Sequence, residues 1–87
     1  MLMNRRKLLK KLSDGSFNNV SFTDARNLLE GFGFHLSRIN GSHHVFTNVG
    51  IQEQINFQDV NGEAKPYQLR QLIRLVERYN LNLEDEL

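Results

Sequence analysis

The sequence has no cysteine, a single proline and no long hydrophobic run. Without cysteine, the chain forms no disulfide and no zinc site built on thiolates. The N-terminal segment, residues 1–7, ends in three basic residues but is not followed by the apolar segment of a signal peptide. Lys10 and Lys11 interrupt the run that Leu8 and Leu9 begin. The sequence therefore predicts a cytoplasmic protein that does not enter a membrane.

The charge is almost balanced overall but unevenly distributed along the chain. Eleven basic and ten acidic side chains give a formal net charge of +1 over 87 residues. Basic residues crowd the first eleven positions, whereas residues 84–86 are all acidic. A local anion-binding face is compatible with this asymmetry, because the net charge averages over it. A chain of this length forms one small domain.

Three segments have the periodicity of amphipathic helices. Residues 5–13 place leucines on one side, and a second short helix follows Ser21, whose spacing to Asp24 is typical of a capping box. The last helix begins at Pro66, since proline is favoured at the first helical position. Spacings of three and four predict that its core-facing side chains are Leu69, Leu72, Ile73, Val76 and Tyr79.

A β-hairpin is predicted in the middle of the chain. Asn40-Gly41 favours a type I′ turn, which needs residues that tolerate a positive φ, and residues 34–39 and 43–47 partly alternate apolar and polar on either side. Residues 54–57 are expected to add a third strand, and residues 58–65 a polar loop. The order helix, helix, three strands, helix predicts an α+β fold, a three-stranded antiparallel sheet with helices packed on one face.

Two of the three histidines, His43 and His44, begin the second strand of this hairpin. Adjacent strand residues point to opposite faces, so the two side chains cannot have the same role. One of them can be a reactive group, because imidazole exchanges protons near neutral pH, while the other packs or meets solvent. His35 on the preceding strand is a further candidate to face either of them. No metal site is expected, since no carboxylate lies at a helpful spacing.

The sequence contains three segments in order, residues 28–34 (LLEGFGF), 38–46 (RINGSHHVF) and 65–73 (KPYQLRQLI). Together they resemble the HicA toxin family, and the resemblance extends over residues 21–80. It implies a double-stranded-RNA-binding-domain fold, cleavage of mRNA and pairing with a HicB-like antitoxin. By position, the first histidine after the serine is the catalytic one, which here is His43. Many members also have a proline and a second histidine after the third strand, where this sequence has residues 56–60.

With this resemblance, the chain is interpreted as a single domain in three parts. Residues 1–20 are an N-terminal helix and loop extension, residues 21–80 are the HicA-like core, and residues 81–87 are an acidic C-terminal tail. The extension either contacts an antitoxin or adds to the core.

RNA carries its own nucleophile, the 2′-hydroxyl, so cleavage can proceed without a metal ion, and no cofactor is expected. The protein must take a proton from that hydroxyl, give one to the leaving 5′-oxygen and stabilise the crowded phosphate. We expect His43 to transfer a proton and Arg38 or Lys65 to face the phosphate. Lys65 also precedes a helix start, where backbone amides attract phosphate.

The other RNA-binding candidates each have a structural alternative. Ser42 is either a small turn residue or a hydroxyl that contacts phosphate, and turn geometry alone explains Gly41. Arg70, Arg74 and Arg78 form one stripe on the last helix, which either follows an RNA backbone or is a solvated face. The full set of RNA-binding candidates is Arg38, Gly41, Ser42, His44, Lys65, Arg70 and Arg74.

The leading hypothesis is therefore the mRNA-cleaving toxin of a type II toxin–antitoxin system. Two other functions are compatible with the sequence. One is an RNA-binding module without catalysis, which would use the same hairpin and helix start. The other is a protein-interaction adaptor whose last helix docks a partner through Tyr67 and Tyr79.

Overall fold

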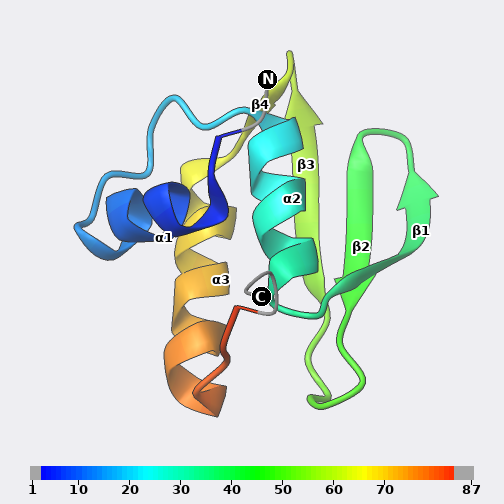
Figure 1. Cartoon of the computed structure of the whole chain (residues 1–87). Helices are drawn as coiled ribbons and strands as arrows, with labels where there is room; N and C mark the ends of the chain where they lie inside the picture. Colours follow the sequence, from blue (N-terminus) through cyan, green and yellow to red (C-terminus); the bar gives the residue numbers. More distant parts are fainter. Residues whose placement is uncertain (1–2, 84–87) are drawn as a thin grey trace.

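The three helices lie where the sequence predicts them. In the computed structural model, which describes residues 3–83, α1 spans Arg5–Ser13, α2 spans Phe22–Gly31 and α3 spans Pro66–Tyr79 (Figure 1). The Ser21 side chain caps α2 by accepting from the backbone N–H of Asp24 at 3.0 Å, and Pro66 opens α3. Local capping and periodicity thus determine these boundaries.

The sheet has four antiparallel strands in the order β1-β2-β3-β4, one more than predicted. They are β1 (His35–Asn40), β2 (His43–Thr47), β3 (Ile55–Val60) and β4 (Glu63–Ala64). The α+β class, with its double-stranded-RNA-binding-domain-like arrangement, is confirmed, but the prediction that residues 58–65 form only a polar loop was wrong.

Asn61-Gly62 is the reason for the fourth strand. Both residues have a positive φ, 53° and 84°, and they join Val60 to its partner Glu63. This is the type I′ geometry that the sequence analysis assigned to the first hairpin. In that first hairpin, Asn40 instead pairs with His43, and only Gly41 of the two loop residues has a positive φ, 64°. A glycine at the first central position is typical of a type II′ turn.

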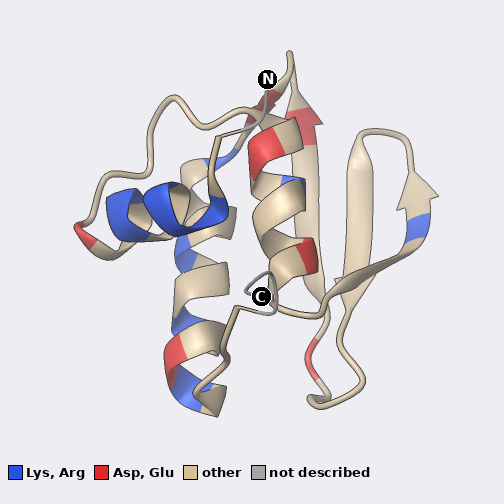
Figure 2. Ribbon diagram, viewed as in Figure 1, with Lys and Arg blue, Asp and Glu red and all other residues tan. Residues whose placement is uncertain are grey.

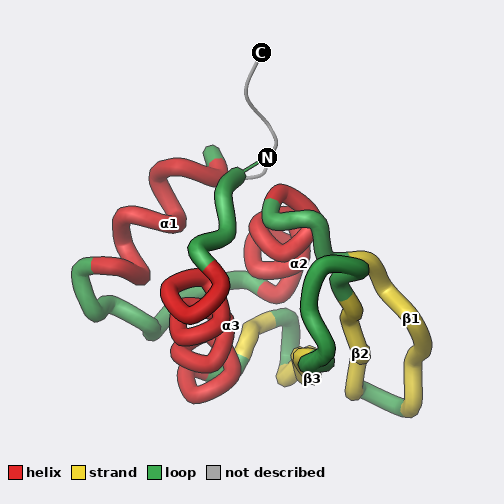
Figure 3. The backbone as a smooth tube through the Cα atoms, turned by 90° about the horizontal axis from the view of Figure 1, so that it is seen from below, coloured by secondary structure: helices red, strands yellow, loops and turns green. Residues whose placement is uncertain are grey.

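One face of the sheet is buried under the helices. Figures 1 and 3 show the helices on one side, with the β1–β2 hairpin extending beyond them. Phe34, Phe46 and Phe57 are fully buried at the centre of the core. Tyr79, predicted to face inward, is 37% exposed, because the buried stripe of α3 runs through other positions. That stripe consists of Gln68, Leu69, Leu72 and Leu75.

The N-terminal helix α1 contributes to this same core. Leu8 and Leu12 are each only 1% exposed, and the helix packs against α2 and α3. The Arg5 guanidinium also donates two hydrogen bonds, of 2.9 and 3.1 Å, to Asn27 Oδ1 of α2. Of the predicted acidic tail, Leu81 and Leu83 pack against the core, whereas residues 84–87 lie outside the described part of the chain.

We predict that Leu12→Ala lowers the free energy of unfolding by about 2–4 kcal/mol, because it removes a buried side chain and leaves a cavity. Urea denaturation followed by circular dichroism measures the change. Leu9→Ala, at a partly buried position of the same helix, is the control and costs less. An unchanged stability for Leu12→Ala would show that α1 is not part of the cooperative core.

Candidate active site

The turn between β1 and β2 brings the two adjacent histidines to one end of the sheet. Gly41 and Ser42 are both exposed loop residues, and a side chain at Gly41 would meet nothing within 4 Å. The Ser42 carbonyl accepts a hydrogen bond from the backbone N–H of Asp59 at 3.0 Å, which ties the turn to the far end of β3. The turn is therefore held in place while its outer surface remains accessible.

His43 lies on the face of the sheet that is left uncovered by α1, α2 and α3. Phe46, three residues further along β2, is fully buried, so strand alternation directs His43 to the opposite, open face. His43 pairs across the sheet with Asn40 on β1 and with Gln58 on β3, and its side chain is exposed. The ring is held by Asn56, whose amide Nδ2 donates to His43 Nδ1 at 2.9 Å. His43 thus combines solvent access with a fixed ring nitrogen.

A β-bulge brings Arg38 to the same open face. Leu36 pairs with Phe46, but the next pair is Arg38 with Val45, so Ser37 is an extra residue in β1. Without it, Arg38 would lie opposite His44 and point to the helical side. Arg38 and His43 are instead diagonal neighbours on the open face, about 7–8 Å apart, a separation that a long side chain can span.

His44 points toward the helices and packs there. Its ring lies 4.6 Å from that of Phe22 between centroids, at an interplanar angle of 53°. Its Nδ1 donates to the carbonyl of Ser42 at 3.1 Å, and since a carbonyl only accepts, Nδ1 carries the proton. These contacts favour packing, one of the roles that the sequence leaves open for His44.

His35 does not face either of the other two histidines. It pairs with Thr47, at the opposite end of β2 from His43. Within residues 3–83, no group of three or more histidine, aspartate or glutamate side chains is arranged to hold a metal ion.

Lys65 lies where β4 passes into α3, close to the strand position that pairs with His43. The buried side chain of Gln68, 1% exposed, accepts from the backbone N–H of Gln58 at 2.7 Å and so fastens the first turn of α3 to β3. Gln68 was not predicted from the sequence, although a polar residue four positions before Leu72 on the apolar stripe was a signal. Lys65 Nζ lies 5.9 Å from the centre of the Tyr67 ring.

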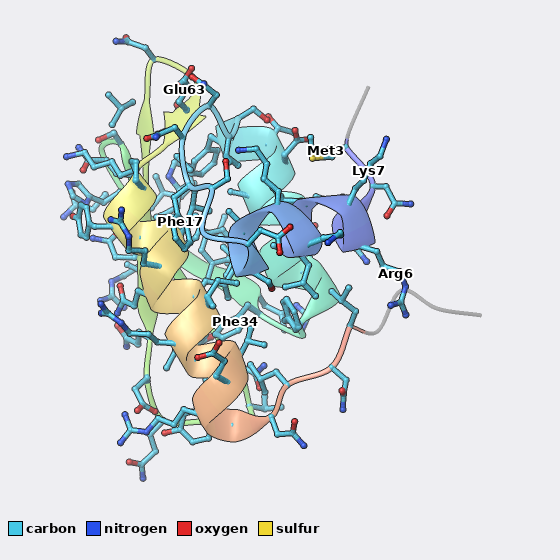
Figure 4. All side chains as sticks on the ribbon, turned by 90° about the vertical axis from the view of Figure 1, so that its left-hand side faces the viewer. Met3, Arg6, Lys7, Phe17, Phe34 and Glu63 are labelled. Carbon is cyan, nitrogen blue, oxygen red and sulfur yellow. The ribbon has the colours of Figure 1, made fainter. Side chains whose placement is uncertain are left out.

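Arg70 and Arg74 belong to the helical layer. The Arg70 guanidinium lies over the ring of Phe17, 4.9 Å from its centre, and Phe17 comes from the loop between α1 and α2 (Figure 4). Arg74 is exposed one turn further along α3. Figure 2 shows basic residues along α1 and α3, whereas Arg38 is the only lysine or arginine in the hairpin, residues 35–47.

Among the described residues, the two side chains with a shifted pKa lie at the other end of the sheet, one in the β2–β3 loop and one at the end of α3. The hydrogen bond from the Tyr79 hydroxyl lowers the pKa of the Glu53 carboxyl, and the same bond raises the pKa of Tyr79. Arg78 adds an ion pair of 3.3 Å to Glu53. Both tyrosines of the adaptor hypothesis thus have internal contacts, since Tyr67 accepts from Gln68 Nε2 at 3.3 Å.

Comparison with protein families identifies the class of the protein. A model of toxins from bacterial toxin–antitoxin systems matches residues 22–77, which is more than half of the chain. The chain belongs to this family, the HicA toxins, and a toxin of this kind acts opposite an antitoxin partner. Searches of curated proteins and of solved structures found no match. No helix in the described residues is long and apolar enough to cross a membrane.

The different surroundings of the two histidines predict different effects on stability. His44→Ala removes the ring that packs on Phe22 and is expected to lower the free energy of unfolding by about 1 kcal/mol. His43→Ala removes an exposed side chain and is expected to change it by less than about 0.5 kcal/mol. Urea denaturation of both variants measures this difference, and equal losses would contradict the assignment of His44 to packing.

Proposed function

We propose that this toxin is a metal-independent ribonuclease that cleaves mRNA in the cytoplasm, with His43 as the proton-transferring group. We propose further that a HicB-like antitoxin holds it inactive by covering the open face of the sheet. The observation that carries the proposal is the position of His43, exposed on this face and held at one ring nitrogen by Asn56.

The reaction needs two proton transfers around one phosphate. The 2′-oxygen of the RNA attacks the neighbouring phosphorus, and the bond from phosphorus to the 5′-oxygen breaks. The 2′-hydroxyl loses its proton, and the leaving 5′-oxygen gains one. His43 carries out one of these transfers, which is typically worth about 10²–10⁴-fold in rate.

Cations near His43 supply the electrostatic part of catalysis. Arg38 shares the open face and is proposed to stabilise the negative charge that builds up on the phosphate. Lys65 is proposed to contact the RNA from the start of α3, and the turn residues Gly41 and Ser42 to let a phosphate approach closely. His44 supports this surface by packing.

Arg70 and Arg74 are proposed to contact the RNA backbone further from the reacting phosphate. Both are exposed, and they follow each other on one face of α3. Contacts of this kind add affinity that weakens with salt, without taking part in the chemical step.

The first test is RNA cleavage by His43→Ala. We expect the variant to cleave RNA about 10²–10⁴-fold more slowly than the wild type and to lose growth arrest on induced expression, because the proton transfer is lost. The assay is run in EDTA, where wild-type cleavage persists if no metal ion takes part. His35→Ala, a second exposed histidine at the far end of the hairpin, is the matched control and should retain full activity.

Three outcomes would contradict the proposal. Equal cleavage by wild type and His43→Ala would assign His43 a structural role, and loss of wild-type cleavage in EDTA would contradict the metal-free mechanism. RNA binding without cleavage by either protein would instead support the non-catalytic RNA-binding module.

The second test separates Arg38 from the α3 stripe. Arg38→Ala is expected to lower kcat on the order of 10²-fold, because a cation beside the reacting phosphate is lost. Arg74→Ala is expected to leave kcat unchanged and to reduce the salt dependence of RNA binding by about one phosphate contact. Cleavage kinetics at several salt concentrations measure both effects, and an unchanged kcat for Arg38→Ala would remove Arg38 from the reaction.

A further inference from the structure

The contact between Asn56 and His43 crosses two strands. Asn56 on β3 pairs with Val45 on β2, two residues beyond His43, so the two side chains meet diagonally on the open face. The distance from Asn56 Nδ2 to His43 Nδ1 is 2.9 Å, and both residues are exposed. Neither side chain contributes to the core, so the hydrogen bond orients the ring without supporting the fold.

The chemistry of this contact determines where the proton of the neutral ring lies. An amide N–H only donates, so the His43 nitrogen that faces it must offer a lone pair. In the neutral ring, the single proton is then on Nε2. Nδ1 is occupied by Asn56, which leaves Nε2 as the nitrogen that faces solvent.

We infer that Asn56 is a positioning residue for His43, which holds the ring by Nδ1 and makes Nε2 the atom that exchanges a proton with RNA. This inference rests on the proposed ribonuclease function. Asn56 lies in the segment after Gln54, for which the sequence predicted only a strand and a departure from the family pattern.

A carboxamide suits this role because it can serve both protonation states of the ring. When His43 is neutral with its proton on Nε2, the amide nitrogen donates to Nδ1, as in the structure. When Nδ1 carries a proton, rotation of the Asn56 amide by about 180° turns its oxygen to accept a hydrogen bond from Nδ1–H. Only in this second form does the neutral ring have a lone pair on Nε2, so His43 takes the proton of the 2′-hydroxyl there while the Asn56 oxygen holds Nδ1–H. The change between the two forms needs no movement of either strand.

Aspartate at this position would lack one of these two abilities, and leucine would lack both. A carboxylate only accepts, so aspartate would favour a proton on Nδ1. Leucine has a similar size but makes no hydrogen bond, so it would leave the ring free to rotate. These differences make the role of Asn56 testable apart from its place in the strand.

The experiment measures the ring nitrogens of His43 by ¹H–¹⁵N NMR and RNA cleavage by steady-state kinetics, on the same proteins. We expect the neutral wild-type ring to carry its proton on Nε2 and Asn56→Asp to shift it to Nδ1. We expect Asn56→Leu to lower kcat by about 10- to 100-fold with little change in KM, since the reacting group is misplaced while RNA contacts remain. Gln54→Asp and Gln54→Leu introduce the same two residues at an exposed position just before β3 and should alter neither readout.

The two readouts distinguish failure of this inference from failure of the proposed function. A proton that stays on Nε2 in Asn56→Asp, or a wild-type kcat in Asn56→Leu, would overturn the role of Asn56 while leaving a ribonuclease intact. The proposed function fails in another way. If the ring proton shifts in Asn56→Asp but the wild-type protein cleaves no RNA, the ribonuclease is refuted, and the positioning role with it.

Discussion

Burial of only one face of the sheet is the constraint on which the site depends. Phe46 and Phe57 meet edge to face, 6.4 Å apart at an interplanar angle of 76°, and both are completely buried. Because side chains alternate along a strand, these two rings direct His43 on β2 and Asn56 on β3 to the other face. A slip of one residue in either strand would exchange the faces and expose the core, so the packing that stabilises the fold also fixes the register of the site.

The elements with local signals could be predicted from the sequence, and those that depend on pairing could not. The cap at Ser21 and the apolar stripe after Pro66 are local signals, because each lies in or next to the helix that it specifies. Asn61-Gly62 carried the same turn signal as Asn40-Gly41, but only two strand residues follow it, which is too short for a visible alternation. The prediction that Tyr79 faces inward was wrong, because α3 extends beyond the core at this residue and the Tyr79 hydroxyl donates a hydrogen bond to Glu53.

The candidate site, too, could be predicted only where its signal is local in the sequence. The place of His43 beside the turn is visible in the sequence, because the turn and the histidines are adjacent, but its choice over His44 came from the resemblance to the HicA family. The shared face of Arg38 and His43 could not be predicted, since it depends on the bulge at Ser37. This bulge shifts the pairing of β1 by one residue and has no distinct local pattern. The contact with Asn56 joins residues 13 positions apart and depends on the register of β2 with β3, which periodicity alone does not fix.

The arrangement of the three histidines has a consequence for the rate of the proposed reaction. His44 is on the opposite face, and His35 is displaced from His43 by four residues along β2, which corresponds to about 13 Å. Neither can therefore share a phosphate with His43, and the second proton transfer falls to water or to the RNA itself. A ribonuclease with a single histidine loses one contribution from acid–base catalysis and is slow by that factor. The orientation of the one remaining ring then limits the rate, which makes the hydrogen bond from Asn56 more consequential here than it would be beside a histidine pair.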